Sequence, residues 1–315
     1  MHLLIPFAST PADACRQAAS DLRLPHLQAL LARLTPGLRD EADEYQLSPP
    51  HERALARAWG WQGADGALPF AADAAAQDGI ATDDLAWGLL TPLHWHVGAE
   101  HLTILPPAEL QLAEAESREL CEAARPLFED EGWALVWAAP QRWYVAHESL
   151  HELPTASLDR VVGRNPDLWM PDHPQARLLR RLQNEVQMLW YTHPVNDARE
   201  ARGALPANSV WLSGCGMRQP RSGEPVTVHD ALRQPVLAED WAAWADAWRA
   251  LDAGPLREAL LTLQRGTPVQ ITLTGERNGQ TWASAPGGVP LSQRLTRRLL
   301  ARFRQPDVPA LLAAL

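Results

Sequence analysis

The sequence comprises 315 residues with a net charge of −10 and a pI near 5.5, which is long enough for one large or two ordinary domains. This acidic balance argues against direct binding to nucleic-acid phosphates or anionic lipids, because both depend on clustered cations. All 28 basic residues are arginine, which excludes lysine Schiff-base chemistry, pyridoxal phosphate attachment and a phosphate-loop lysine.

The start of the chain and its cysteines indicate a cytoplasmic protein. The short apolar run at 2–7 predicts a first strand, since it lacks the basic leader of a signal peptide. Cys15, Cys121 and Cys215 form no CxxC pair, which suits a reducing compartment without a cysteine metal site. No apolar run approaches membrane-spanning length, so no membrane partner is expected.

The first half of the chain alternates between strand and helix patterns. Helical spacing appears at 26–34, and the pattern at 48–61 predicts a second helix with Ser48 as its N-cap. A strand at 101–106, a helix at 109–132 and two strands around Pro140 then predict a compact α+β unit.

The second half begins with a strongly amphipathic helix at 175–192. Residues 217–236 are polar and proline-rich, which predicts a connection. The helix at 241–251 carries Trp241, Trp244 and Trp248 on one face, a stripe typical of a core. Asn278-Gly279 predicts a strand pair at 269–285. A closing helix has a basic face formed by Arg294, Arg297, Arg298, Arg302 and Arg304.

Two histidine patterns are candidates for metal binding. The segment HESLH at 147–151 satisfies HExxH, in which His147 and His151 would bind zinc on a helix and Glu148 would act as general base. The preceding YVA resembles a strand end, however, and Pro154 stops any helix there. His94 and His96 would point the same way on a strand, but we favour hydrogen-bonded structural histidines as the explanation. We therefore expect no metal and no cofactor.

The stretch HPVNDAREARGALPANSVWLSGCG at 193–216 is the strongest candidate for a binding site. Polar loop residues stand ahead of an apolar strand, and small residues at its end admit a ligand to the backbone. The arginine-rich region around it offers guanidinium groups that hold phosphate or carboxylate, although surface helix arginines are the alternative. The predicted anion-binding residues are His193, Asn196, Arg199, Arg202 and Asn208; the wider arginine region adds Arg177, Arg180, Arg181 and Arg218.

The same stretch resembles the archaeal-type cofactor-independent phosphoglycerate mutases of the alkaline phosphatase superfamily, in which HPVN, Arg, Gly and PAN precede an apolar strand. SLDRVVGRNPDLWMP at 157–171 and ESRELCEAARPLF at 116–128 extend the similarity over about 101–216. The family binds two divalent metals through Asp and His and uses a serine as phosphoryl acceptor. Here Phe7-Ala8-Ser9 replaces the aspartate-glycine pair expected after the first strand, and the C-terminal third offers only His229.

The whole chain also resembles a proteobacterial family described as phosphoglycerate mutase or as a regulatory protein of RpfE type, often encoded beside a single-strand exonuclease. Together the two resemblances imply an α/β fold with a degenerate alkaline-phosphatase-like core at 1–95 and 217–315. A small α+β insertion domain is expected at 96–216.

Three functions follow from these observations. The leading hypothesis is a mutase-like pseudoenzyme without the two-metal site, acting as a regulatory or scaffold protein that binds a small phosphorylated or carboxylate ligand. The enzyme alternative is a metal-dependent phosphoglycerate mutase or phosphatase with rearranged ligands, whose residues to test are Ser48, His94, His96 and His193. The third is a protein partner of a DNA-repair nuclease. The catalytic residues are unassigned in all three.

Overall fold

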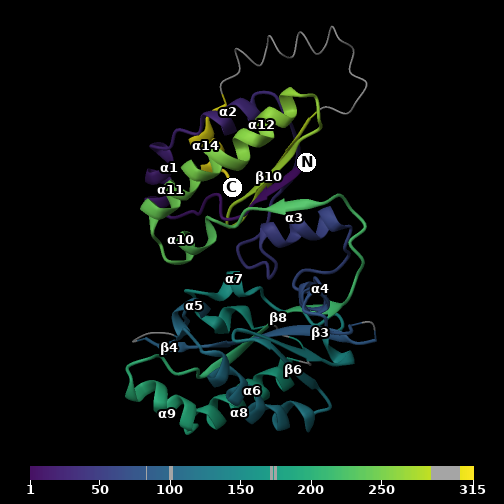
Figure 1. The fold of residues 1–315 in the computed structure, drawn as a ribbon, viewed down its shortest axis with the longest axis vertical. Coiled ribbons are helices and arrows are strands. Elements are labelled where there is room, and N and C mark those ends of the chain that lie inside the picture. Colours follow the sequence, from purple (N-terminus) through teal and green to yellow (C-terminus); the bar gives the residue numbers. More distant parts are fainter. Residues whose placement is uncertain (83, 99–101, 171–172, 174–175, 285–305) are drawn as a thin grey trace. The chain divides into compact units, whose positions relative to one another are not determined.

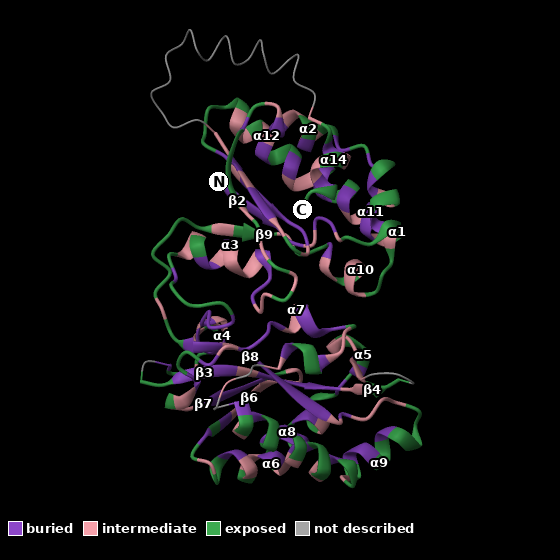
Figure 2. Cartoon of the chain, turned by 180° about the vertical axis from the view of Figure 1, so that it is seen from behind, coloured by how far each residue is buried: buried purple, intermediate pink, exposed green. Residues whose placement is uncertain are grey.

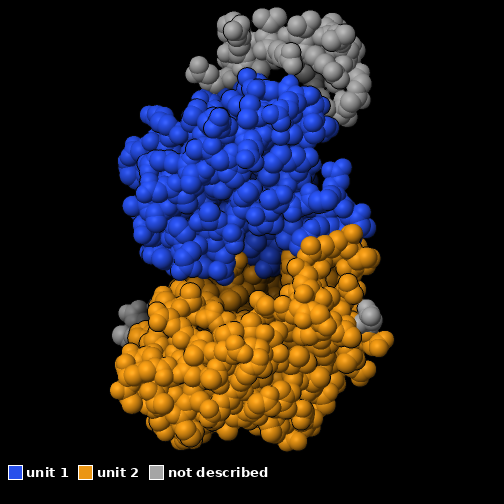
Figure 3. All heavy atoms as spheres, in the orientation of Figure 1, with its two compact units in different colours: residues 1–44, 49–60, 222–315 blue, residues 45–48, 61–221 orange. Residues whose placement is uncertain are grey.

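The structure is a computed structural model that describes residues 1–315 apart from 83, 99–101, 171–172, 174–175 and 285–305. The chain forms two compact units (Figure 3). Unit 1 comprises residues 1–44, 49–60 and 222–315, and unit 2 comprises residues 45–48 and 61–221. Unit 2 is thus inserted in the chain between parts of unit 1. The basic helix predicted at 294–304 lies outside the described residues.

Unit 1 contains a five-stranded sheet in the order β2-β11-β10-β1-β9. Strand β1 (His2–Ile5) lies between β10 (Gln270–Thr274) and β9 (Val226–Val228) and is parallel to both. Strand β11 (Gly279–Ala283) is antiparallel to β10 and to β2 (Thr35–Asp40). The predicted first strand is confirmed, and its fully buried apolar run is typical of an interior parallel strand.

The helices of unit 1 pack around this sheet (Figure 1). The tryptophan stripe on α11 does belong to the core, because Trp244 and Trp248 are fully buried. Their indole N–H groups donate to the carbonyls of Phe7 and Ala8, at 3.1 and 3.3 Å. The helices are α1 (Asp13–Ser20), α2 (Pro25–Leu31), α3 (Pro50–Trp59), α10 (Arg233–Leu237), α11 (Trp241–Leu251), the π-helix η3 (Asp252–Leu256), α12 (Arg257–Gln264) and α14 (Val308–Ala313).

Two predictions for unit 1 are wrong in detail. Ser48 is not the N-cap of α3: Pro49 occupies that position, and the Ser48 hydroxyl accepts a hydrogen bond from the Gly66 amide at 2.8 Å within unit 2. The segment 217–236 is not only a connection, because it contains β9 and α10. These elements are too short, at three and five residues, to produce a clear periodic pattern.

Unit 2 is centred on a four-stranded antiparallel sheet in the order β6-β7-β3-β8. Along β7, Trp143 and Val145 enter one apolar cluster, whereas Tyr144 and Ala146 enter another. Both faces of the sheet are therefore covered. The strands are β3 (Ala86–Leu93), β6 (Ala134–Ala139), β7 (Arg142–Ala146) and β8 (Ser209–Met217), with a separate pair formed by β4 (Trp95–Val97) and β5 (Leu102–Ile104).

Helices cover the two faces of this sheet unequally. The long helices α6 and α8 lie on one face, and α4 lies on the other, which both views show (Figures 1 and 2). The predicted helix at 175–192 is confirmed almost to its ends by α8. The helices are α4 (Phe70–Gln77), α5 (Pro107–Leu110), α6 (Glu114–Glu129), α7 (Leu158–Val161), α8 (Ala176–Tyr191) and α9 (Pro194–Ala201), with short 3-10 turns η1 (Glu148–Leu150) and η2 (Pro166–Trp169).

The division between the units differs from the expected boundary at residues 95 and 96. Strand β3 ends at Leu93, ahead of that boundary, yet it pairs with β7 on one side and β8 on the other. The contacts of residues 61–95 therefore place them in unit 2.

Among the described helices, none has both the length and the apolar character needed to cross a bilayer.

Candidate functional site

The segment predicted as a polar loop ahead of β8 begins with a helix, α9. His193 is its N-cap residue, and the Nδ1 atom accepts a hydrogen bond from the Val195 amide at 3.3 Å. Pro194 occupies the first helical position, where its missing N–H costs nothing. The loop prediction is wrong at 194–201, because His193 and Pro194 begin a helix there.

Asn196 is buried and all of its amide atoms are used by the fold. The Nδ2 atom donates to the carbonyls of Trp190 and Ala207, at 2.9 and 2.7 Å. The Oδ1 atom accepts from the Ala207 amide at 2.9 Å. The side chain thus joins the end of α8 to the segment before β8, and its hydrogen-bonding groups face protein.

Arg199 is a buried cation whose three nitrogen atoms each donate to the protein. Its side chain is 0% exposed. The Nε atom donates to the Leu205 carbonyl at 2.7 Å, Nη2 donates to the Leu110 carbonyl, and Nη1 pairs with the Glu116 carboxylate. A buried guanidinium needs such partners, since an unpaired buried charge is very costly.

Arg202 binds the other oxygen of the same carboxylate, but its side chain is 52% exposed. Burial alone would raise the pKa of Glu116. The hydrogen bond from Arg202, the Ala113 amide and the charges of both arginines outweigh it, so the pKa lies below its usual value. Glu116 is therefore the anion that Arg199 and Arg202 bind in the structure. The predicted binding of an external anionic ligand at these residues stays a prediction.

Asn208 holds β4 in place instead of facing a ligand. Its Oδ1 accepts from the Trp95 amide at 2.7 Å, and its Nδ2 donates to the Trp95 carbonyl at 2.9 Å. The neighbouring His94 Nδ1 lies 2.8 Å from the Pro206 carbonyl oxygen. The segment 206–208 therefore fixes the backbone at Trp95.

The two glycines of GCG, Gly214 and Gly216, lie inside β8 with positive φ values of 65° and 152°. A Cβ at Gly214 would lie 3.1 Å from the Ala71 amide, and one at Gly216 would lie 3.1 Å from the Pro69 Cβ. These glycines admit the start of α4 to the strand. The close approach of Pro69 and Ala71 therefore explains both glycines without a ligand.

The metal candidates do not form a ligand set in the structure. His147 follows strand β7, and the HExxH segment contains only the short turn η1, so its two histidines do not share a helix face. The rings of His94 and His96 lie 6.4 Å apart. In the described part of the chain, no three His, Cys, Asp or Glu side chains are grouped to hold a metal ion.

A cavity of about 400 Å³ lies beside Trp95 in unit 2. We call it the Trp95 cavity. Its walls come from β4, the segment at η2, one side of α8 and the first residue of β8. The lining residues are Trp95, Asp167, Met170, Arg180, Gln183, Asn184, Gln187 and Ser209.

The cavity combines one cation with several amide groups. Gln183 is buried, and its Nε2 donates to the Val210 carbonyl at 2.9 Å, which fixes that side chain. The Trp95 indole nitrogen is buried and finds no acceptor in the described residues. An aromatic wall with a guanidinium, amides and one carboxylate is suited to a small polar anion.

Sequence reasoning assigned this region only in part. It identified Arg180 within the arginine-rich region and Asn208, which positions Trp95. It missed the amides of α8, because Gln183, Asn184 and Gln187 fit an amphipathic helix without any ligand. Their spacing on one side of the helix was the available signal.

No protein-family model matches the chain, and no curated protein matches it. Among solved structures, it is similar to the cofactor-independent phosphoglycerate mutase from Thermoplasma acidophilum DSM 1728, with 13% identity, a TM-score of 0.37, and coverage of 91% of this chain and 90% of that one. It is also similar to the PH0037 protein from Pyrococcus horikoshii, with 12% identity, a TM-score of 0.47, and coverage of 98% and 97%.

The chain has a mixed α/β fold, as predicted. The resemblance to the RpfE-type family receives no support from these comparisons.

Proposed function

We propose that this protein is a non-catalytic regulatory or scaffold protein that binds a small anionic ligand in the Trp95 cavity. The observation that carries the proposal is the convergence of Arg180, several amides and an indole on one cavity. Its volume of about 400 Å³ lies within the range of small-molecule sites. The eight described lining residues include one carboxylate but no imidazole or thiol, so they supply groups for binding and not an evident nucleophile–base pair.

Each kind of lining group has a separate task in this proposal. The Arg180 guanidinium forms paired hydrogen bonds with a carboxylate or phosphate. Asn184 and Gln187 donate to or accept from hydroxyl groups, and the Asp167 carboxylate accepts from a hydroxyl. The Trp95 indole supplies an aromatic wall for the ligand. The expected ligand is therefore a small hydroxylated anion.

The test is thermal unfolding with three probes: inorganic phosphate, glycerate and 3-phosphoglycerate. The sequence resemblance to phosphoglycerate mutases makes the last of these the natural first choice. A ligand at 100 times its Kd stabilises the folded state by about 2.7 kcal/mol. We expect at least one probe to raise the Tm of the wild type, and Arg180→Gln to abolish the rise.

Arg177→Gln is the matched control, because Arg177 lies one turn away on α8 and does not line this cavity. The control should keep the ligand-dependent rise. The absence of a rise with all three probes, or a rise that persists in Arg180→Gln, would contradict the binding proposal. Turnover of 3-phosphoglycerate with added manganese, abolished by a chelator, would contradict the non-catalytic part alone.

A further inference from the structure

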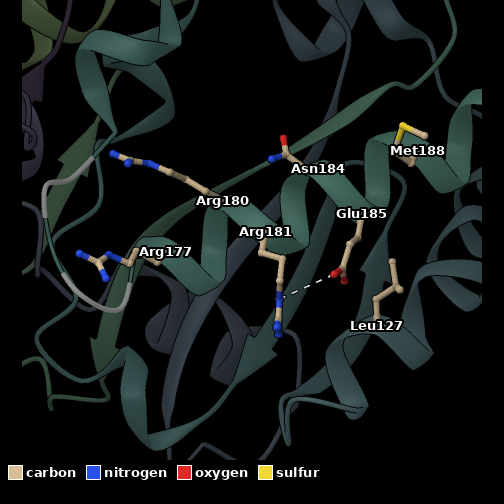
Figure 4. Close-up of a pocket in the computed structure, with 7 residues that line it drawn as sticks. All are labelled: Leu127, Arg177, Arg180, Arg181, Asn184, Glu185 and Met188. Atoms are coloured by element: carbon tan, nitrogen blue, oxygen red, sulfur yellow. Dashed lines mark ion pairs between the residues drawn. The ribbon is translucent and has the colours of Figure 1, made fainter.

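A second hollow of about 610 Å³ lies on the adjacent side of α8, facing α6. We call it the α8 groove, and Figure 4 shows the side chains that line it. Two of these residues, Arg180 and Asn184, also line the Trp95 cavity. The lining residues are Leu127, Arg177, Arg180, Arg181, Asn184, Glu185 and Met188.

The groove is cationic although the whole chain is acidic. Three arginines and one glutamate line it, against a net charge of −10 for the protein. Arg181 is paired with Glu131 and lies 3.7 Å from Glu185. Arg177 extends from the first half of α8, away from that pair (Figure 4). This half of the groove therefore complements a negatively charged partner.

The other half of the groove carries two apolar side chains, of which Met188 is exposed and Leu127 is half-buried. Leu127 extends from α6 toward α8, and Met188 lies near the end of α8 (Figure 4). Met188 is 74% exposed, and Tyr191, one turn beyond it, is 81% exposed. Methionine, tyrosine and arginine are enriched where proteins bind one another, and methionine adapts to different partner shapes.

The two halves are separated by a defined distance. Arg177 and Met188 are eleven residues apart on one helix, which corresponds to about 16 Å along its axis. A small anion cannot reach both ends. A peptide of about eleven residues in a helix can contact both when its carboxylates and its apolar side chains lie on one face.

We propose that the α8 groove docks an acidic amphipathic helical segment of a partner protein. A carboxylate of the partner pairs with Arg177, and an apolar side chain packs between Leu127 and Met188. Charge excludes the chain's own C-terminal segment 294–304 as the occupant, because its five arginines would repel those of the groove. The apolar half favours a peptide over a nucleic acid, whose backbone would leave it uncovered.

The experiment measures fluorescence anisotropy of a labelled helical peptide with three glutamates at one end and two leucines eleven residues away. We expect saturable binding to the full-length protein that weakens as salt is added. Arg177→Gln and Met188→Ala should each weaken binding about tenfold, the size typical of an interface anchor. Arg180 is left unchanged, so the result is independent of the Trp95 cavity.

Two exposed residues of unit 1 provide matched controls. Arg249→Gln and Leu261→Ala change the same residue classes without altering a residue that lines the groove, and they should leave the affinity unchanged. A second peptide with lysine in place of glutamate should bind at least tenfold more weakly.

Several results would overturn the proposal. The first is that the glutamate peptide shows no saturable binding, and the second is that the lysine peptide binds as tightly as the glutamate peptide. The third is that the groove variants and the control variants have the same affinity for the glutamate peptide. The fourth is that a labelled single-stranded oligonucleotide binds more tightly than the glutamate peptide. Light scattering tests a further outcome. If the wild type self-associates and Met188→Ala abolishes the self-association, the occupant is a second copy of this chain, and the proposal is overturned.

Discussion

Arg199 on α9 and Arg177 on α8 belong to the same unit, but their surroundings in the structure are opposite. Arg199 is sealed inside unit 2 and donates to two carbonyls and to Glu116. Arg177 is exposed and lines an open groove. The difference shows that a dense run of polar residues in a sequence indicates interactions without saying whether their partner is the protein or a ligand.

The largest expected effect tests the structural half of this comparison. Arg199→Ala should lower the free energy of unfolding by about 3–5 kcal/mol, because it leaves Glu116 without its buried partner and two carbonyls without a donor. Urea unfolding followed by circular dichroism measures the change. Arg202→Ala removes the exposed partner of the same carboxylate and should cost less than about 1 kcal/mol.

An Arg199→Ala variant that fails to fold still agrees with this prediction, so Glu116→Gln supplies a milder test. It keeps an acceptor oxygen for the arginine but removes the charge, and its cost should lie between those of the two arginine variants. Equal stability of wild type and Arg199→Ala would show that the arginine is not the structural anchor described above.

A second prediction concerns a buried residue without a charge. Asn196→Ala should lower the free energy of unfolding by about 2–3 kcal/mol, since it leaves the buried carbonyls of Trp190 and Ala207 without their hydrogen-bond donor. Asn208→Ala affects a half-buried residue and should cost less. Chemical denaturation of both variants gives the order, and the reverse order would contradict the roles assigned to the two amides.

The third prediction addresses a half-exposed ion pair, in which Arg142 donates two hydrogen bonds to Asp78 at 2.7 and 2.9 Å. These bonds lower the pKa of Asp78 most; burial opposes them, and the Tyr144 hydroxyl and the charge of Arg142 lower it further. The stabilisation is present above the unfolded pKa of about 3.9 and is lost as the pH falls through the lower folded value.

Arg142→Gln should therefore cost less than about 1 kcal/mol at pH 6, because this pair is only partly buried. The difference from the wild type should shrink as the pH is lowered from 4 toward 3. Urea unfolding at several pH values checks this, with Arg118→Gln, whose pair with Glu114 is exposed, as the control. A difference that grows at low pH would contradict the assignment.

The smallest effect is expected at the groove itself. Arg177→Gln should change the free energy of unfolding by no more than about 0.5 kcal/mol, because the residue is exposed. Thermal and urea unfolding without ligand measure it. A loss above 1 kcal/mol would show that Arg177 is structural like Arg199, and the contrast between the two would disappear.

Strong periodicity made much of the fold predictable. The helices α8 and α11 lie where the apolar spacing placed them. Strand β1 lies at the short apolar run, and β10 and β11 lie on either side of the predicted turn. Strand β3 was not predicted, because AWGLLTPL carries a glycine and a proline and shows no alternation. Its place in the centre of the unit 2 sheet depends on pairing with strands far away in the sequence, which local patterns do not encode.

The site was less predictable than the fold. Two of the predicted site residues form hydrogen bonds within the protein: Asn196 with Ala207, and Arg199 with Glu116. Both partners lie outside α9. Only the folded structure shows that these acceptors are nearby. Arg180 was noted as one of several arginines, but its position beside Trp95 depends on β4, which Asn208 anchors.

The insertion of unit 2 also determines the order in which the protein can fold on the ribosome. Strand β1 emerges first, yet it pairs with β9 at 226–228 and with β10 at 270–274. At about 5–20 residues per second, β1 waits roughly 10 to 45 s for its first partner. The whole of unit 2 is synthesised in that interval. Its antiparallel sheet can therefore form while β1, an apolar strand of unit 1, still lacks both of its neighbouring strands.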